Sequence, residues 1–416
     1  MTTNAVNAAG PTDDRPPPAV LVSREEALAA TCKLKEGIAG RAEETESARS
    51  VSPDSIAEMV DAGLFGIVTP KRYGGSELGF ATLLEVQAEI GSACASTGWV
   101  YGVLAGHTWL AALFPEQAQD EVFADPRSLI ASLIRLGGSP PERVPGGFRW
   151  RGGTGRFCSG IDHSDWVLVG GLVSDGDGAP EPWYFLIPRG DVEIVDDWYT
   201  VGLRGTGSKS LVVTDAFIPE HRAVRFADLS AGNAPGAAIH EGGLYRQAYD
   251  TVWPFSLPGA AVGAGRAALE VFTSSTRRRL EGLPPIAQAS NGTALARIAK
   301  AASQIDAATY LLLHHAEEAD KAPARPVFDT VARARRQRDL AFAVQQVREA
   351  VNTLYEASGG SGVYESGAIQ RWWRDVNTAA EHVAFTWDLA SVAFGRAAVG
   401  LGQGEGPKPG PGVRAR

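Results

Sequence analysis

Apolar residues recur at steps of three and four through the first part of the chain. Ile56, Met59 and Val60 show this spacing, and Ser52 followed by Pro53 is a typical helix start. A period near 3.6 residues places such side chains on one face of a helix. The pattern predicts a helical domain over residues 23–127.

The pattern changes to short apolar and β-branched runs between residues 128 and 238. Runs of this kind occupy residues 128–136, 166–173, 183–188 and 211–219. Glycine-rich turns separate them, for example at residues 145–147 and 175–178. This segment is therefore predicted to form a small antiparallel β domain.

Long helical patterns return over residues 239–400. One core-facing stripe consists of Val327, Val331, Leu340, Val344, Val347, Val351 and Leu354. Long helices with one apolar stripe pack naturally side by side, so a C-terminal four-helix bundle is predicted. Residues 1–22 are expected to form a disordered arm and residues 401–416 a flexible tail. The fold class is α+β.

Composition and charge limit the classes of partner. The 416 residues carry a net charge of −9, so the chain lacks the basic field that attracts nucleic acids and anionic membranes. Its cysteines, Cys32, Cys94 and Cys158, match no disulfide, zinc or dithiol pattern. We expect a cytoplasmic protein whose partners are small molecules or other proteins.

One uncharged segment has the length of a membrane span. Residues 91–115 contain no Asp, Glu, Lys or Arg and are long enough to cross a bilayer. Polar residues such as Ser96 and Thr97 dilute its hydrophobicity, and flanking basic residues are missing. We therefore expect no membrane span, but two buried helices divided at Gly98 or Gly102.

Several motifs resemble functional signatures but lack the required context. The Gly-Ala-Gly run at 263–265 begins a loose dinucleotide fingerprint, yet it lies inside a helical pattern, where small residues favour close helix packing. Asp162, His163 and Asp165 are neighbours in a turn and lack two further well-spaced ligands. His314 and His315 are adjacent on a helix and should not share a face. No metal site is predicted.

Two other histidines are stronger candidates. His382 lies in a helix predicted over residues 377–388, one turn after Thr378. The periodicity leaves open whether His382 is a core histidine or a site residue. His107 lies in the uncharged segment, where burying an imidazole costs about 1–3 kcal/mol unless it finds a hydrogen-bond partner or a ligand.

Sequence marks from about residue 25 to residue 400 resemble one fold family. They are Gly63-Leu64-Phe65-Gly66, Pro70, Tyr73-Gly74-Gly75, the Gly359-Gly360 pair with Gly362, and Arg374-Asp375. Together they resemble the acyl-CoA dehydrogenase fold, with an N-terminal helical domain, a central β domain and a C-terminal four-helix bundle. The Tyr-Glu-Gly-Thr turn that holds the catalytic glutamate of the dehydrogenases is missing, although Glu381 lies in that region.

Three further segments resemble a branch of that fold with different chemistry. They are ACASTGW at 93–99, SGIDHSDW at 159–166 and LRGTGS at 203–208. These are similar to flavin-dependent aromatic hydroxylases of two-component systems, above all those that modify aromatic polyketides in antibiotic biosynthesis. The resemblance implies a homotetrameric oxygenase. It would take reduced FMN, or FAD, from an NAD(P)H-dependent reductase, and O2 would form a C4a-hydroperoxide that hydroxylates a small aromatic substrate.

The resemblance also implies roles for individual residues. The implied flavin contacts are Ser159 near the ring, Phe157 and Cys158 on the same strand, Arg204, Thr206 and Ser208 in a glycine-rich loop, Arg278 at the phosphate, and Arg374. The Arg278 contact would cross a subunit boundary. His107 and Ser132 would hydrogen-bond the substrate hydroxyl or carbonyl, and His382 would be a base or the hydrogen-bond partner of the peroxide.

Three other functions stay open at this point. The same flavin peroxide could oxygenate the nitrogen of an amine or amino sugar, or the sulfur of a thioether. The chain could instead be an FAD-dependent acyl-CoA dehydrogenase, which would need an essential carboxylate. A catalytically silent scaffold in a biosynthetic complex is the alternative outside enzymology.

Overall fold

The computed structural model describes residues 16–401, apart from residues 135, 175–178, 290–291 and 322–328. Most of the predicted arm and nearly all of the predicted tail lie outside the described residues. At residues 16–22 the structure differs from the predicted arm. The Ala19 amide donates to the Asp61 carbonyl over 3.1 Å, and Leu21 is buried. Ordered chain therefore begins before Ser23, because Leu21 finds an apolar site.

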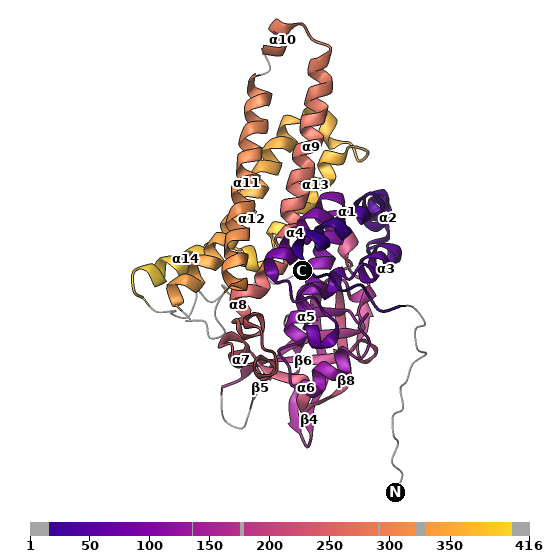
Figure 1. Ribbon diagram of the computed structural model, residues 1–416, viewed down its shortest axis with the longest axis vertical. Helices are drawn as coiled ribbons and strands as arrows, with labels where there is room; N and C mark the ends of the chain where they lie inside the picture. The colour runs from indigo at the N-terminus through magenta and orange to yellow at the C-terminus, as the bar shows by residue number, and fades with distance from the viewer. Residues whose placement is uncertain (1–15, 135, 175–178, 290–291, 322–328, 402–416) are drawn as a thin grey trace.

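Helices form the N-terminal block, as predicted. They are α1 (Arg24–Gly40), α2 (Ala42–Ala48), α3 (Pro53–Asp61), α4 (Phe80–Ala93), α5 (Ala95–Ala111) and α6 (Glu116–Val122). Pro53 occupies the first position of α3, where its missing N–H costs nothing. α4 packs against α5 and against α9 of the C-terminal block, so it joins the two helical blocks (Figure 1).

The buried segment after residue 91 is not divided where the sequence suggested. α5 runs unbroken through Gly98 and Gly102, and the break falls at Cys94, whose backbone is extended. The two glycines serve close packing instead: a Cβ on Gly98 would lie 2.7 Å from the Gly91 Cα, and one on Gly102 would overlap the Gln87 amide. None of the described helices is both long and apolar enough for a membrane span.

The central block contains two sheets rather than one continuous array. Its strands are β1 (Ile130–Leu133), β2 (Gly137–Gly138), β3 (Glu142–Val144), β4 (Gly147–Cys158), β5 (Trp166–Val173), β6 (Glu181–Pro188), β7 (Glu193–Val195), β8 (Lys209–Pro219) and β9 (Ala223–Arg225). One sheet has the order β1-β5-β6-β9 and the other β2-β4-β8-β7, with β3 beside β4. The pairing is antiparallel except between β1 and β5, which run parallel.

Strand β4 is the longest of the block, and the apolar pattern did not reveal it. Its sequence GFRWRGGTGRFC is rich in Gly and Arg, so alternation is weak. Pairing with β8 over most of its length supplies the order that local propensity does not. Trp150 of β4 packs edge to face on Phe185 of β6, with ring centroids 5.4 Å apart, and joins the two sheets.

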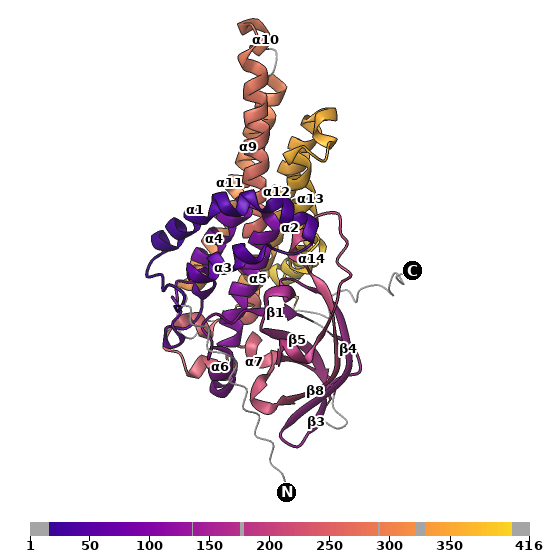
Figure 2. The same ribbon diagram turned by 90° about the vertical axis from the view of Figure 1, so that its right-hand side faces the viewer.

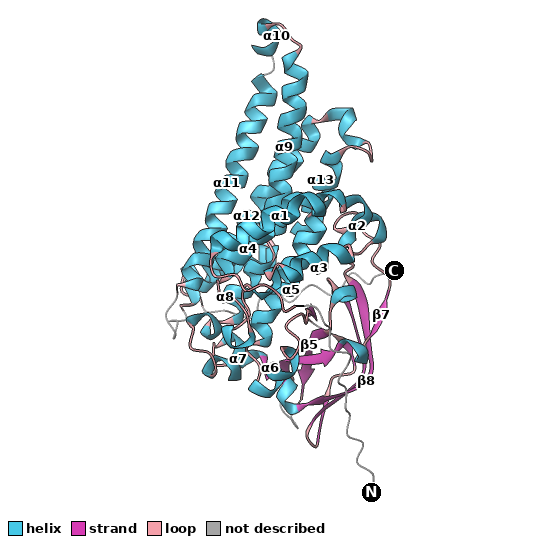
Figure 3. Cartoon of the chain, turned by 45° about the vertical axis from the view of Figure 1, so that its right-hand side comes forward, coloured by secondary structure: helices cyan, strands magenta, loops and turns pink. Residues whose placement is uncertain are grey.

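Long helices form the C-terminal block. They are α9 (Gly259–Glu281), α11 (Gly292–Asp320), α12 (Thr330–Ala357) and α13 (Ala368–Ala380), preceded by the short α7 (Phe226–Ser230) and α8 (Tyr249–Val252), with α10 (Pro285–Ala289) at the tip and α14 (Trp387–Ala398) at the end. The four long helices pack on one another as the predicted bundle. Figures 1 and 2 show α9 and α11 projecting beyond the rest, and Figure 3 shows the strands gathered beside the opposite end.

The described part of the predicted stripe faces the core of this bundle. Leu340, Val344, Val347 and Val351 are buried, whereas Val331 is exposed near the start of α12. Val327 lies outside the described residues. The Gly-Ala-Gly run at 263–265 lies inside α9, as expected from its helical context, and a Cβ on Gly263 would overlap the α4 backbone.

Gly102 gives a direct test of the close packing. The Gln87 side chain donates to the Ser256 carbonyl over 2.8 Å and accepts from the Gly259 amide over 2.9 Å, directly against Gly102. Gly102→Ala should lower the free energy of unfolding by about 2 kcal/mol, because the methyl group displaces this buried clamp. Gly40→Ala is the matched control, since nothing lies within 4 Å of its added methyl. Equal urea midpoints for the two variants would contradict this packing.

Candidate active site

A cavity of about 550 Å³ lies where the three blocks meet. Its walls come from α5, β1, the end of β4, the 198–208 loop, the 3-10 helix η9 (Trp253–Ser256) and the segment after α13. They are mostly apolar, with three tryptophans: Trp99, Trp198 and Trp253. Pockets of this size and character bind small organic ligands.

The structure brings together a subset of the predicted site residues. Those that line the cavity are Ser132, Phe157, Ser159, Thr206, Ser208 and His382. The predicted residues outside its lining are His107, Cys158, Arg204, Arg278 and Arg374.

Strand periodicity explains why Cys158 is separated from its neighbours. Successive side chains of a strand point to opposite faces. Phe157 and Ser159 face the cavity, whereas Cys158 is fully buried on the other side, and that burial raises the pKa of its thiol. An irregularity in pairing at the end of β4 gives Phe157 a left-handed φ of 77°, a costly backbone conformation for this residue type. Its ring lies edge to face against Trp198.

A chain of hydrogen bonds runs along the polar edge of the cavity. The Trp99 indole N–H donates to Ser159 Oγ over 3.2 Å, and Ser159 Oγ lies 2.7 Å from Ser208 Oγ. Ser208 Oγ lies 2.7 Å from Thr206 Oγ1, whose hydroxyl donates to the Leu203 carbonyl over 2.8 Å. All three hydroxyl-bearing residues are buried.

His107 lies behind the cavity wall as a neutral acceptor. Its Nδ1 is 2.9 Å from the Ile130 carbonyl, which can only accept, so Nδ1 carries the hydrogen. Burial lowers the His107 pKa to about 4, so Nε2 keeps its lone pair at neutral pH. Within the described chain Nε2 has no partner, and neither has the indole Nε1 of Trp253, on which His107 stacks.

His382 presents a hydrogen-bond donor, whereas His107 presents an acceptor. The predicted helix over 377–388 is wrong at this point: α13 ends at Ala380, and His382 begins a 3-10 turn, η11 (Val383–Phe385). The side-chain Nδ1 caps that turn by accepting from the Ala384 amide over 3.2 Å. Burial lowers the His382 pKa to about 4, so the neutral ring carries its hydrogen on Nε2. The ring packs edge to face on Trp99.

Arg204 is part of the loop that carries the hydroxyls, and Arg374 of α13 lies beside that loop. Arg374 forms an ion pair with Glu46 at 2.6 Å and donates to the Val201 carbonyl over 2.7 Å. Arg204 borders a small crevice with Glu46 and Asp375. Arg374 is therefore held by a carboxylate and a carbonyl and fixes the loop, whereas the Arg204 Nε is buried without a hydrogen-bond partner among the described residues. Arg278 is exposed near the far end of α9.

Asp375, the residue after Arg374, has a buried carboxylate, and its role in positioning the loop was not predicted from the sequence. Asp375 accepts from the Leu203 amide over 2.6 Å, and Leu203 has a left-handed φ of 49°. Burial raises the Asp375 pKa to about 6. Trp253 was also missed, since no short motif surrounds it and only the packing brings it to the cavity. Trp99, by contrast, already stood in the 93–99 segment singled out by sequence.

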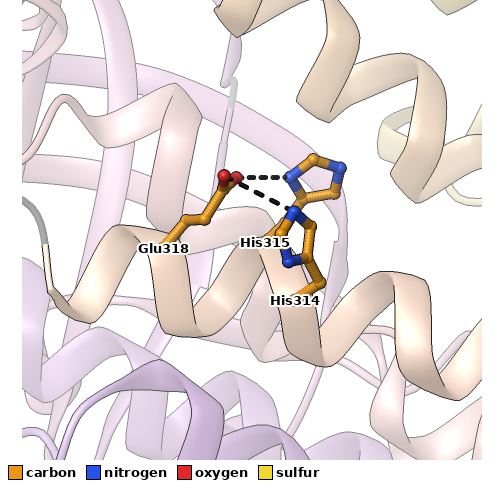
Figure 4. A group of neighbouring side chains, drawn as sticks. All are labelled: His314, His315 and Glu318. Carbon is orange, nitrogen blue, oxygen red and sulfur yellow. Dashed lines mark hydrogen bonds and ion pairs between the residues drawn. The ribbon is translucent and has the colours of Figure 1, made fainter.

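The adjacent histidines of α11 also depart from expectation. His314 and His315 both approach the Glu318 carboxylate, so they do share a partner (Figure 4). His315 Nε2 lies 2.8 Å from the buried Asp339 of α12, which also contacts neighbouring arginines of its own helix. The carboxylates of this cluster therefore already have histidine and arginine side chains as partners. The cluster links α11 to α12. Asp162 likewise already has a cation as its partner, because Lys209 of β8 lies 2.9 Å from its carboxylate.

Comparison with known proteins supports the architecture. Two family models match: the acyl-CoA dehydrogenase N-terminal domain over residues 25–123 and the acyl-CoA dehydrogenase C-terminal domain over residues 256–387. The oxygenase component of a FADH2-dependent resorcinol hydroxylase from Rhizobium sp. (strain MTP-10005) is 34% identical over 372 residues. That alignment covers 86% of this chain and 90% of the relative.

Solved structures agree with these matches. The HsaA monooxygenase from M. tuberculosis superposes with a TM-score of 0.85 and 34% identity, over 92% of this chain and 99% of that one. XiaF from Streptomyces sp., solved with FADH2 and glycerol, gives a TM-score of 0.81 and 30% identity, over 91% and 96%. The fold resemblance inferred from the sequence is confirmed, and the chain belongs to the flavin-dependent monooxygenases that share the acyl-CoA dehydrogenase fold.

Proposed function

We propose that this chain is the oxygenase component that hydroxylates a phenolic, polyketide-derived aromatic substrate. Reduced flavin, FMN or FAD, would come from a separate NAD(P)H-dependent reductase. The observation behind the proposal is one apolar cavity bounded by a hydroxyl chain and flanked by two neutral histidines of opposite polarity. The names of the relatives, among them a resorcinol hydroxylase, favour a phenol.

The cavity suits a flavin ring beside an aromatic substrate. Its volume of about 550 Å³ lies within the range of cofactor and ligand pockets, and flat indole side chains border it. Ser159 and Ser208 place polar atoms along one edge, where a flavin ring needs hydrogen-bond partners. A bound reduced flavin activates O2 and delivers one oxygen atom. The protein supplies binding, orientation and exclusion of water.

His107 is proposed as the hydrogen-bond acceptor for the substrate at the other wall of the cavity. His107 is adjacent to that wall, because its ring bonds to Ile130, two residues before Ser132, and stacks on Trp253. A phenolic O–H that reaches His107 Nε2 from the cavity would satisfy this orphaned acceptor, and Ser132 lines the same cavity. The free Trp253 N–H would be available to the phenolic oxygen.

His382 is proposed as a hydrogen-bond donor rather than a base. Its Nδ1 lone pair is used by the Ala384 amide, and its remaining nitrogen bears hydrogen. A ring in this state can donate to an oxygen atom but has no free lone pair with which to remove a phenolic proton. Of the two roles that the resemblance implied, the local geometry favours the hydrogen-bond partner.

The alternative functions receive less support. A dehydrogenase would need a buried carboxylate at the cavity, whereas Glu381 is exposed and paired with Arg348. An amine can donate an N–H to His107 and keep its lone pair, so this acceptor does not separate an amine from a phenol. The names of the relatives favour the phenol. Homotetramer formation, an Arg278 contact to phosphate across a subunit boundary, and a cytoplasmic location stay predictions.

Matched substrates test the proposal. We expect the protein, mixed with reduced FMN in aerated buffer, to hydroxylate resorcinol but to convert its dimethyl ether poorly. The ether lacks the O–H that His107 would accept, although its ring and oxygens remain. Product and H2O2 are measured per reduced FMN consumed. Equal product from the two compounds, or product from 3-aminophenol only at nitrogen, would contradict the proposed phenol recognition.

His382→Ala should reduce product per reduced FMN about tenfold and raise H2O2 by the missing amount, because one donor to the reacting oxygen is lost. His382→Gln keeps an N–H group at similar reach and should restore a large part of the product yield. Val383→Ala, at a neighbouring cavity position, is the control for altered shape. Normal coupling in His382→Ala would refute the role of this side chain.

A further inference from the structure

The hydroxyl chain at the cavity edge has a single possible direction. At one end, the Leu203 carbonyl can only accept, and Thr206 Oγ1 lies 2.8 Å from it. Two oxygen atoms at that distance without a hydrogen between them would repel each other, so the Thr206 hydroxyl hydrogen points at Leu203. A threonine has one such hydrogen, and Thr206 Oγ1 must therefore accept from Ser208.

The same counting fixes the remaining links. The Ser208 hydrogen is used on Thr206, so Ser208 Oγ accepts from Ser159 over 2.7 Å. At the other end, the Trp99 indole can only donate, and Ser159 Oγ accepts from it. Every hydroxyl hydrogen is then used inside the wall. What Ser159 can still offer to the cavity is a lone pair.

The Leu203 anchor is itself held in place. Its carbonyl also accepts from the Trp198 indole over 3.1 Å and from the Thr206 amide over 3.1 Å. Its amide donates to Asp375, which fixes the peptide on the other side. Reversal of the chain would leave oxygen facing oxygen at this crowded carbonyl, so the direction is a property of the folded loop.

We propose that this one-way chain makes the site selective for the reduced form of the flavin, with Thr206, Ser208 and Trp99 as positioning residues. The N5 atom of a flavin bears a hydrogen when the ring is reduced and only a lone pair when it is oxidised. An acceptor at Ser159 complements the first state and repels the second. The inference rests on the proposed function, because it requires the flavin edge to meet Ser159.

Selection of this kind serves a two-component oxygenase. Reduced flavin arrives from solution and oxidised flavin must leave, so a site that held both states equally would be blocked by its own spent cofactor. The discrimination comes from hydrogen-bond polarity alone. It needs no change of charge in the wall and no movement of the loop.

Thr206→Val tests the direction of the chain. Valine matches the shape of threonine but offers Ser208 no acceptor, so the Ser208 hydrogen turns to Ser159 and the Ser159 hydrogen becomes free to point into the cavity. The ratio of the Kd for oxidised FMN to the Kd for reduced FMN should fall at least about tenfold. For a two-electron couple, this corresponds to a midpoint potential of bound FMN lowered by about 30 mV.

Three further variants separate the effect of hydrogen-bond direction from the effect of a disturbed fold. Thr206→Ser keeps the hydroxyl and should retain the wild-type ratio. Ser208→Ala removes the acceptor of Ser159 and should lower the ratio as Thr206→Val does, which provides a second test if valine perturbs the fold. Thr200→Val is the matched control, because Thr200 donates to the Gly202 carbonyl in the same loop without touching the chain. Its ratio should not change.

Anaerobic titration of the full-length variants with oxidised and with reduced FMN gives both constants. A wild-type protein that binds neither form would overturn the proposed function and this inference together. A wild-type protein that prefers reduced FMN, with the same ratio in Thr206→Val and Ser208→Ala, would overturn the inference and leave the proposed function standing. A lowered ratio in both variants, with Thr206→Ser and Thr200→Val unchanged, is the result we expect.

Discussion

The hydrogen bond from the Leu203 amide to the buried Asp375 carboxylate is the contact on which the polar cavity wall depends. It joins the glycine-rich loop of the β block to α13 of the helical bundle. Leu203 can adopt its left-handed backbone because this bond and the packing of the next turn hold it there. The carbonyl of the same residue then anchors the hydroxyls that end at Ser159.

Desolvation sets the chemistry of the cavity as much as any single residue does. Burial keeps His107 and His382 neutral, with a pKa of about 4 each, and one backbone contact to each ring decides which nitrogen carries the hydrogen. The protein therefore presents a fixed acceptor and a fixed donor, and neither of these two rings carries a charge. Such an environment suits a cofactor that performs the difficult chemistry while the protein excludes water and orients the substrate.

Periodicity was sufficient for the three blocks, because long helices and alternating strands follow from local patterns. It failed at β4, where order comes from pairing with β8, and at Gly98 and Gly102, which serve close packing inside a continuous helix. Ser159 and His382 were predicted from resemblance. Asp375 and Trp253 gained their roles only from long-range contacts, which no local pattern encodes.

The most direct test of the account is a single turnover with labelled oxygen. The protein is mixed with reduced FMN and resorcinol under ¹⁸O₂, and the product is analysed by mass spectrometry. The account predicts a hydroxylated product that contains one ¹⁸O atom, with little product when the protein is omitted. Absence of hydroxylated product, with all reduced FMN converted to H2O2, or product oxygen derived from water, would contradict it.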